Sequence, residues 1–164
     1  MKEYAYIHQE GTLPQEIENS PFLASFADNH RDELLHISSL VEADPGDEII
    51  SEGADTSRIF ILLSGEIEIR KNGKSITTMG KVGEIFGEIA AVDGEARSAS
   101  VVAVTTAVCL AVDQRFLRDI KPLEEDPSFY AALYEAIAKI LATRLKSASE
   151  EIARLEAVVK NSAA

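Results

Sequence analysis

A series of short apolar segments separated by glycines, between residues 47 and 113, constrains the fold of this chain more than any other feature. Residues 66–70 alternate polar and apolar side chains, which is the period of a half-buried strand. Asn72-Gly73 favours a two-residue type I′ hairpin turn, and residues 100–105 and 107–112 read as two further strands. Because helices do not alternate with these segments, the series predicts an antiparallel sandwich or barrel.

The segments before this series predict helix rather than strand. Residues 1–19 predict an N-terminal arm of mixed character, with some strand near residues 4–7. Residues 20–42 predict a helical region in which Asp28 can cap a helix. The apolar positions of that helix follow a helical spacing: Leu34, Leu35, Ile37 and Leu40.

Two helices are expected after the strands. Residues 114–120 predict a short helix that Pro122 ends. Asp126-Pro127 supplies a capping carboxylate and a first-turn proline for a long helix reaching about residue 160. We therefore divide the chain into an arm (1–19), a β-domain with flanking helices (20–125) and a C-terminal helical element (126–164).

The long helix carries a heptad seam of about three repeats. Its apolar members are Leu141, Leu145, Ala148, Ile152, Leu155 and Val159. The seam predicts a homodimer through this helix. Packing of the helix against its own domain is the alternative, and Glu151 and Glu156 would face each other across a parallel pair, which is mildly unfavourable.

Composition excludes several classes of protein. The net charge of −12, from 16 basic and 28 acidic residues, argues against a nucleic-acid surface, which needs clustered cations. No apolar run approaches the length of a membrane span, and the N-terminus lacks the order of a secretory signal. The single cysteine, Cys109, lies in an apolar strand-like run and reads as a buried structural thiol. We expect a cytoplasmic protein.

The strongest functional signal interrupts the β region between residues 86 and 100. Glu88 and Arg97 stand nine residues apart, with Gly87 before the carboxylate and the small residues Ser98 and Ala99 after the guanidinium. A guanidinium fork binds phosphate oxygens in a bidentate manner, and a carboxylate accepts a hydrogen bond from a ribose hydroxyl. A glycine lets the backbone approach the ligand closely, and the free N–H groups of a helix starting there would face the anion. The pattern suits a cyclic phosphate joined to ribose.

Four motifs in order carry a family resemblance: Pro45-Gly46-Asp47, residues 60–69, residues 82–88 and residues 97–101. With them, the chain resembles the cyclic nucleotide-binding domain family of catabolite activator proteins and kinase regulatory subunits. The resemblance implies an antiparallel β-barrel of the jelly-roll type (a double-stranded β-helix) flanked by helices, the last one long. Members that bind DNA continue into a helix-turn-helix domain, which we do not expect in this chain.

The resemblance also implies roles for individual residues. Glu88 would hold the ribose 2′-hydroxyl and Arg97 the exocyclic phosphate oxygens. The remaining implied ligand contacts are Ile85, Phe86, Gly87, Ile89, Ala90, Ser98 and Ala99, some through apolar walls and some through backbone amides. Ser149 on the long helix would contact the base, in one arrangement from the partner subunit. Ser98 occurs in members that bind either base, so cAMP and cGMP both stay open.

We therefore expect a sensor of cAMP or cGMP without a metal, which switches the conformation of its C-terminal helices and signals to an unidentified protein effector. Two other readings stay open. A ligand-free relative could act as a scaffold or interaction protein. An enzyme, such as a barrel hydrolase of cyclic nucleotides, is disfavoured because His8, His30 and His36 all precede the β region and no metal-ligand set or marked nucleophile follows.

Overall fold

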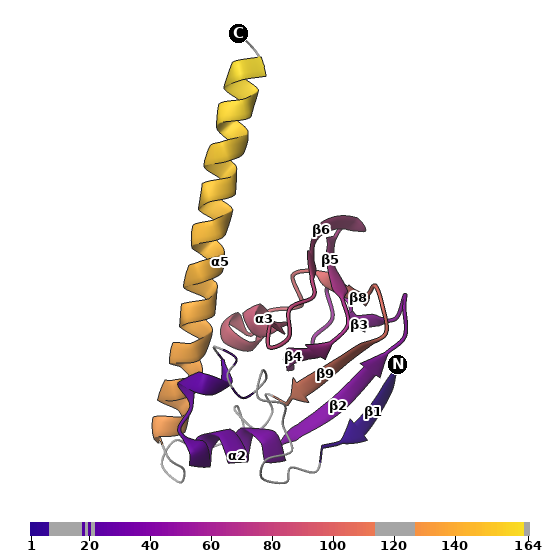
Figure 1. The fold of residues 1–164 in the computed structure, drawn as a ribbon, viewed down its shortest axis with the longest axis vertical. Helices are drawn as coiled ribbons and strands as arrows, with labels where there is room; N and C mark the ends of the chain where they lie inside the picture. The colour runs from indigo at the N-terminus through magenta and orange to yellow at the C-terminus, as the bar shows by residue number, and fades with distance from the viewer. Residues whose placement is uncertain (7–17, 19, 21, 114–126, 163–164) are drawn as a thin grey trace.

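The computed structural model describes residues 1–6, 18, 20, 22–113 and 127–162 (Figure 1). The expected helix over residues 114–120 lies outside the described residues. The strands are β1 (Lys2–Ala5), β2 (Ser38–Ala43), β3 (Glu48–Ile50), β4 (Ile59–Ser64), β5 (Ile67–Lys71), β6 (Lys74–Met79), β7 (Ile85–Phe86), β8 (Ser100–Ala103) and β9 (Ala107–Val112). The helices are η1 (Leu23–Ser25), α2 (Asp28–His36), α3 (Glu88–Asp93) and α5 (Pro127–Ser162).

The strands form two antiparallel sheets, which confirms the predicted fold class. One sheet has the order β1-β2-β9-β4-β7 and the other the order β3-β8-β5-β6. The sheets face each other as in a jelly roll and do not close into a complete barrel. The predicted hairpin is present between β5 and β6, where Asn72 and Gly73 both have positive φ (51° and 73°), as a type I′ turn requires.

The predicted helix over residues 20–42 is wrong at its C-terminal end. Helix α2 ends at His36, and residues 38–43 form β2 between β1 and β9. Val41 and Ala43 are buried in the space between the sheets, and Glu42 between them is not. This is the period of two of a strand, whereas the prediction relied on the helical spacing of Leu40. Pairing with two neighbouring strands outweighs the local helical spacing.

The protein has two apolar cores, because successive side chains of a strand point to opposite faces of its sheet. Ile59 and Ile61 of β4 face the helices, where they pack with Phe22, Leu110 and other buried residues. Phe60 and Leu62 face the second sheet instead. Because both faces of β4 are buried, the strand reads as a continuous apolar run. Helices therefore cover one face of the five-stranded sheet, and the other sheet covers the opposite face.

Cys109 lies in the core between the sheets, as predicted. Burial raises the pKa of its thiol to about 12, so the side chain behaves as a small apolar group. In the part of the chain that the structure describes, no helix has the length and apolar character needed to span a membrane.

Helix α5 begins at Pro127, as predicted, and its 36 residues differ along its length. Leu133, Ala136 and Ile137 are buried against the helix-facing core. Arg144 makes contacts to the domain, and beyond it the helix leaves the domain and extends well past the β-sheets (Figure 1). The exposed apolar residues of this distal half are Leu145, Ile152, Leu155, Val158 and Val159.

Candidate cyclic-nucleotide site

The candidate site begins where β7 ends at Phe86. Gly87 has φ of +79°, and a Cβ on this residue would lie 2.9 Å from both the Arg58 carbonyl oxygen and Arg97 Nη1. Only glycine fits this turn without strain. Helix α3 follows at once with Glu88 as its first residue and ends at Asp93, and the next residue, Gly94, also has positive φ. The short helix turns the chain so that Glu88 points inward.

Arg97 is buried, with 4% of its surface exposed. Its Nε donates to Thr56 Oγ1 (2.9 Å), Nη1 to the Gly87 carbonyl (2.6 Å) and Nη2 to the Arg58 carbonyl (2.6 Å). A guanidinium has five N–H groups, so these three bonds leave two available for a ligand. Burial lowers the pKa of Arg97 and the Glu88 charge partly offsets this, but a guanidinium stays protonated at neutral pH.

The loop before β4 holds Arg97 by its backbone as well. The Gly53 N–H donates to the Arg97 carbonyl (2.8 Å), and the Arg97 N–H donates to the Ala54 carbonyl (2.9 Å). Sequence reasoning missed this loop and Thr56. The separation of 41 residues between Thr56 and Arg97 leaves no local signal. The guanidinium is therefore held by three hydrogen bonds and the Arg97 backbone by two more, all from parts of its own domain.

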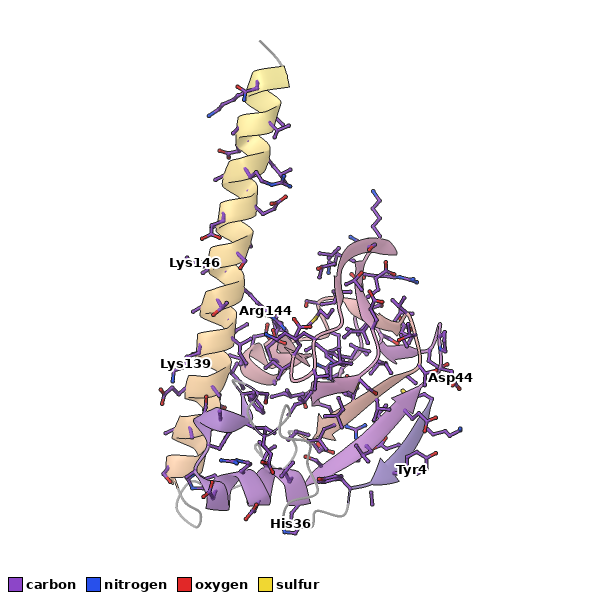
Figure 2. The ribbon with its side chains drawn as sticks, in the orientation of Figure 1. Tyr4, His36, Asp44, Lys139, Arg144 and Lys146 are labelled. Atoms are coloured by element: carbon purple, nitrogen blue, oxygen red, sulfur yellow. The ribbon has the colours of Figure 1, made fainter. Side chains whose placement is uncertain are left out.

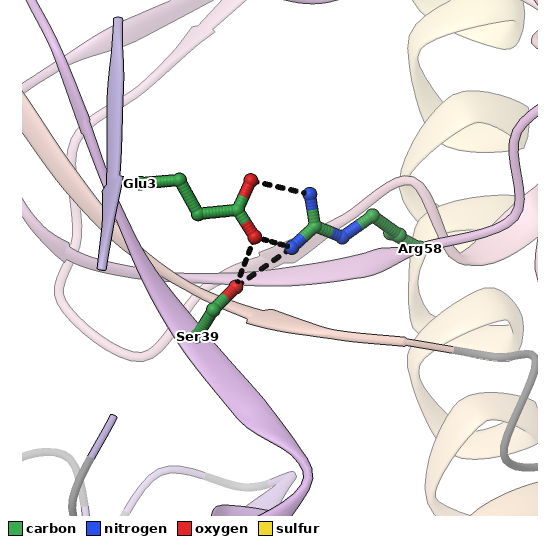
Figure 3. Close-up of polar contacts among 3 residues, drawn as sticks. All are labelled: Glu3, Ser39 and Arg58. Atoms are coloured by element: carbon green, nitrogen blue, oxygen red, sulfur yellow. Dashed lines mark hydrogen bonds and ion pairs between the residues drawn. The ribbon is translucent and has the colours of Figure 1, made fainter. Parts of the chain in front are cut away.

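Arg58, whose carbonyl accepts one of these bonds, is itself tied to the N-terminal strands (Figure 3). Its Nη1 donates to Glu3 Oε2 (3.1 Å) and its Nη2 to Ser39 Oγ (2.7 Å), and Nη2 also pairs with the other Glu3 oxygen. Ser39 donates in turn to Glu3 Oε1 (2.7 Å). Hydrogen bonds from Arg58 and Ser39 lower the pKa of the Glu3 carboxyl.

Glu88 is the second buried charge of the site, with 1% of its surface exposed. Its Oε1 pairs with Nη1 of Arg144, a residue of α5, and Nη2 of Arg144 donates to the Ile85 carbonyl. Figure 2 shows the Arg144 side chain pointing from α5 toward the β-domain. No motif in the long helix marks Arg144, so sequence reasoning missed it as well.

A cavity of about 70 Å³ separates these groups. It is lined by Ile50, Ile69, Phe86, Gly87, Glu88, Ile89, Ala90, Arg97, Ser98, Ala99, Val101 and Arg144. Eight of the ten expected ligand residues thus meet at one place. Ile85 does not line the cavity, and Ser149 lies exposed on α5, donating to the Leu145 carbonyl (2.8 Å). The base contact expected from Ser149 stays a prediction.

The model of the cyclic nucleotide-binding domain family matches residues 40–121, half of the chain. The chain belongs to this family. The Pycsar effector protein XpPycTIR of Xanthomonas perforans is 30% identical over 112 residues, covering 68% of this chain and 36% of that protein. A cGMP-dependent protein kinase of Plasmodium berghei is 40% identical over 82 residues, covering 49% of this chain and 10% of the kinase.

A solved relative agrees with the fold. The catabolite activator protein of Thermus thermophilus matches with a TM-score of 0.66 and 26% identity, over 84% of this chain and 63% of that chain. Our chain spans about a third or less of the length of the curated relatives named above. Among the described residues, no three His, Cys, Asp or Glu side chains gather in a group that could hold a metal ion.

Proposed function

We propose that the chain is a sensor that binds a cyclic purine mononucleotide, cAMP or cGMP, at the cavity between Glu88 and Arg97. One observation carries this proposal. Two side chains of opposite charge, both nearly inaccessible to solvent, line the same cavity and do not pair directly with each other. Buried charges are destabilising unless they are paired. Glu88 is paired with Arg144, whereas the described hydrogen bonds of Arg97 all go to neutral oxygens, so the arrangement points to an anionic ligand at Arg97.

Arg97 would bind the phosphate. Its two remaining N–H groups can each donate to an exocyclic oxygen, and the contacts to Thr56, Gly87 and Arg58 hold the fork in place beforehand. The net charge of −12 means that the protein as a whole repels the ligand. Affinity for the anion must therefore come from this sheltered guanidinium.

Glu88 would accept a hydrogen bond from the ribose 2′-hydroxyl once Arg144 has moved. In the present conformation Arg144 occupies that carboxylate, and the cavity of about 70 Å³ is far below the roughly 300 Å³ of the smaller ligand sites in proteins. A nucleotide would therefore displace Arg144, and with it the distal part of α5. The ligand shifts this equilibrium by its differential affinity for the two states. In this scheme residues 20–125 receive the ligand and residues 126–164 transmit the change to a protein effector.

The distal half of α5 would transmit the change as a dimer. Helices in proteins draw most of their stability from packing of an apolar face, and the exposed stripe of this helix includes Leu145, Ile152 and Leu155. A second copy of the chain presents the same stripe, and pairing of the two would bury both. Ser149 lies within this stretch, so in a dimer it could approach the base in the partner's site.

The test is a calorimetric titration of the chain with cAMP, cGMP and linear 5′-AMP. We expect one site for a cyclic nucleotide, with 5′-AMP much weaker because its phosphate carries a different charge and shape. A hundredfold excess over the dissociation constant should raise the free energy of unfolding by about 2.7 kcal/mol. The closed cavity also suits a ligand-free scaffold, and the absence of binding by either cyclic nucleotide would favour that function.

A further inference from the structure

A second and larger cavity lies on the other side of Arg144, between α5 and the connection from β6 to β7. Its volume is about 380 Å³, within the usual range for small-molecule sites. It is lined by Phe22, Lys81, Val82, Gly83, Glu84, Ile85, Ala136, Lys139, Ile140, Thr143 and Arg144 among the described residues. We call it the α5 groove.

The lining of the α5 groove combines an apolar floor with basic walls. Phe22, Ile85 and Ala136 are almost fully buried and form an apolar floor. Lys81 belongs to the β6–β7 wall and Lys139 to the α5 wall. The lining thus holds three basic residues against one acidic residue, in a protein with 16 basic and 28 acidic residues. This local excess of positive charge runs against the overall composition.

The two lysines can form ion pairs with an incoming anion at a small cost in free energy. Both are exposed, and the pair that Lys139 makes with Glu135 (2.7 Å) lies on the surface, where such pairs are weak. Lysine stems lie along apolar surface while the ammonium reaches outward or across a groove. Arg144 is paired with the buried carboxylate of Glu88, whereas the pair of Lys139 with Glu135 is exposed, so the lysines are the cations of the lining that an anion can recruit most easily.

We propose that the α5 groove binds a small amphiphilic anion, with an aromatic or aliphatic body on the floor and a single acidic group between Lys81 and Lys139. The occupant would contact Ile85 and Arg144, whose carbonyl and guanidinium are joined in the present conformation. If the proposed function holds, an anion in the groove would therefore bias the displacement of α5 that the nucleotide requires. Binding in the groove itself does not depend on that function.

The test uses 8-anilinonaphthalene-1-sulfonate and its uncharged analogue N-phenyl-1-naphthylamine, titrated by fluorescence with no nucleotide present. In the double variant Lys81→Glu/Lys139→Glu, we expect affinity for the sulfonate to fall by about tenfold or more, with less than about threefold change for the neutral analogue. Lys146→Glu, one heptad along α5 and outside the lining, is the matched control and should change neither affinity. Thermal unfolding checks that the exposed substitutions leave the fold intact.

The proposal is overturned if the sulfonate binds the double variant as well as it binds the parent, or if Lys146→Glu has the same effect as the double variant. Equal losses for the sulfonate and the neutral analogue would also overturn it, because a specific anion contact would then be absent. The titration omits cyclic nucleotide, so its failure is distinguishable from failure of the sensor proposal.

Discussion

The phosphate side and the ribose side of the candidate site are held by different parts of the molecule. Arg97 is fixed by Thr56, Gly87 and Arg58, all within the β-domain. Glu88 is paired with Arg144, which reaches it from a helix that leaves the domain a few residues beyond. Under the proposed function, one half of the site would therefore be preorganised for an anion, while the other half would be complete only after α5 has moved.

In the proposed mechanism, the phosphate side would determine the affinity for the ligand and the ribose side would determine the conformational change. A preorganised group strengthens binding without changing shape, because few groups have to be reordered. A contact that exists in one conformation and is replaced by ligand in the other supplies the differential affinity that a switch needs. We therefore expect substitutions of Arg97 and of Arg144 to change affinity in opposite directions.

The largest expected effect is on the phosphate side. Arg97→Ala should weaken binding of the cyclic nucleotide by about 2–5 kcal/mol, since the phosphate would lie unpaired in a dry site. Arg97→Lys should recover part of this loss, because the charge remains but the fork is gone. Calorimetry measures both, with Arg70→Ala on the exposed β5 surface as the control. Unchanged affinity in Arg97→Ala would refute the assignment.

The next effect concerns the helix that holds the ribose side. Leu145→Glu/Ile152→Glu should abolish the proposed dimer, because charges would enter its apolar seam. Ala157→Glu, which by helical phase lies on the opposite side of α5, should leave it intact. Light scattering coupled to size-exclusion chromatography reports the mass directly. A parent chain that is monomeric at high micromolar concentration, or a double variant that stays dimeric, would contradict the dimer.

A smaller effect of opposite sign is expected on the ribose side. Arg144→Gln removes a contact of the ligand-free state, and nucleotide affinity should rise by about 1 kcal/mol, or roughly fivefold, after allowance for the partial exposure of Arg144. The ligand-free variant should also unfold more easily, since Glu88 loses its partner. Lys146→Gln is the control in both calorimetry and urea unfolding. Weaker binding in Arg144→Gln would show that Arg144 belongs to the bound state instead.

The smallest effect lies behind the phosphate side, at the β1 contact to Arg58. Glu3→Gln should reduce the free energy of unfolding by about 0.2–1 kcal/mol at neutral pH, since Glu3 is partly exposed. The folded-state pKa of Glu3 lies below its ordinary value of 4.5, so its contribution is present above that pH and is lost as pH falls through the lowered pKa. Urea unfolding of parent and variant should therefore converge in acid. A constant difference across that range would count against the linkage.

The sequence predicted the parts of the site that depend on local spacing. The turn at Gly87, the carboxylate at Glu88 and the guanidinium at Arg97 stand within eleven residues, and their types are informative. Thr56 and Arg144 were missed because each reaches the site over 41 or 56 residues, and nothing in the local sequence marks them. Contacts of this kind follow from tertiary packing, which a single sequence does not reveal.

For the fold, too, the elements marked by local sequence signals were the ones predicted correctly. The alternation in β5 and the Asn72-Gly73 turn identified strands correctly, because one face of that hairpin is solvated and its pattern is plain. Strand β2 was read as helix because its apolar residues also suited a helical spacing, and pairing with β1 and β9 decided between the two. The start of α5 was predicted correctly, since a capping residue and a first-turn proline are local signals.

Because α5 is long, a small change of its angle at the Arg144 contact would move its far end by a larger distance. The helix continues for 18 residues past Arg144 to Ser162, which is about 27 Å of rigid rod at 1.5 Å per residue. A tilt of roughly 10° about that contact would carry the far tip by about 5 Å, as much as one helical turn. If the proposed function holds, an ångström-scale rearrangement around the ribose hydroxyl would become a displacement of about 5 Å at the helix tip, to which a bound protein could respond.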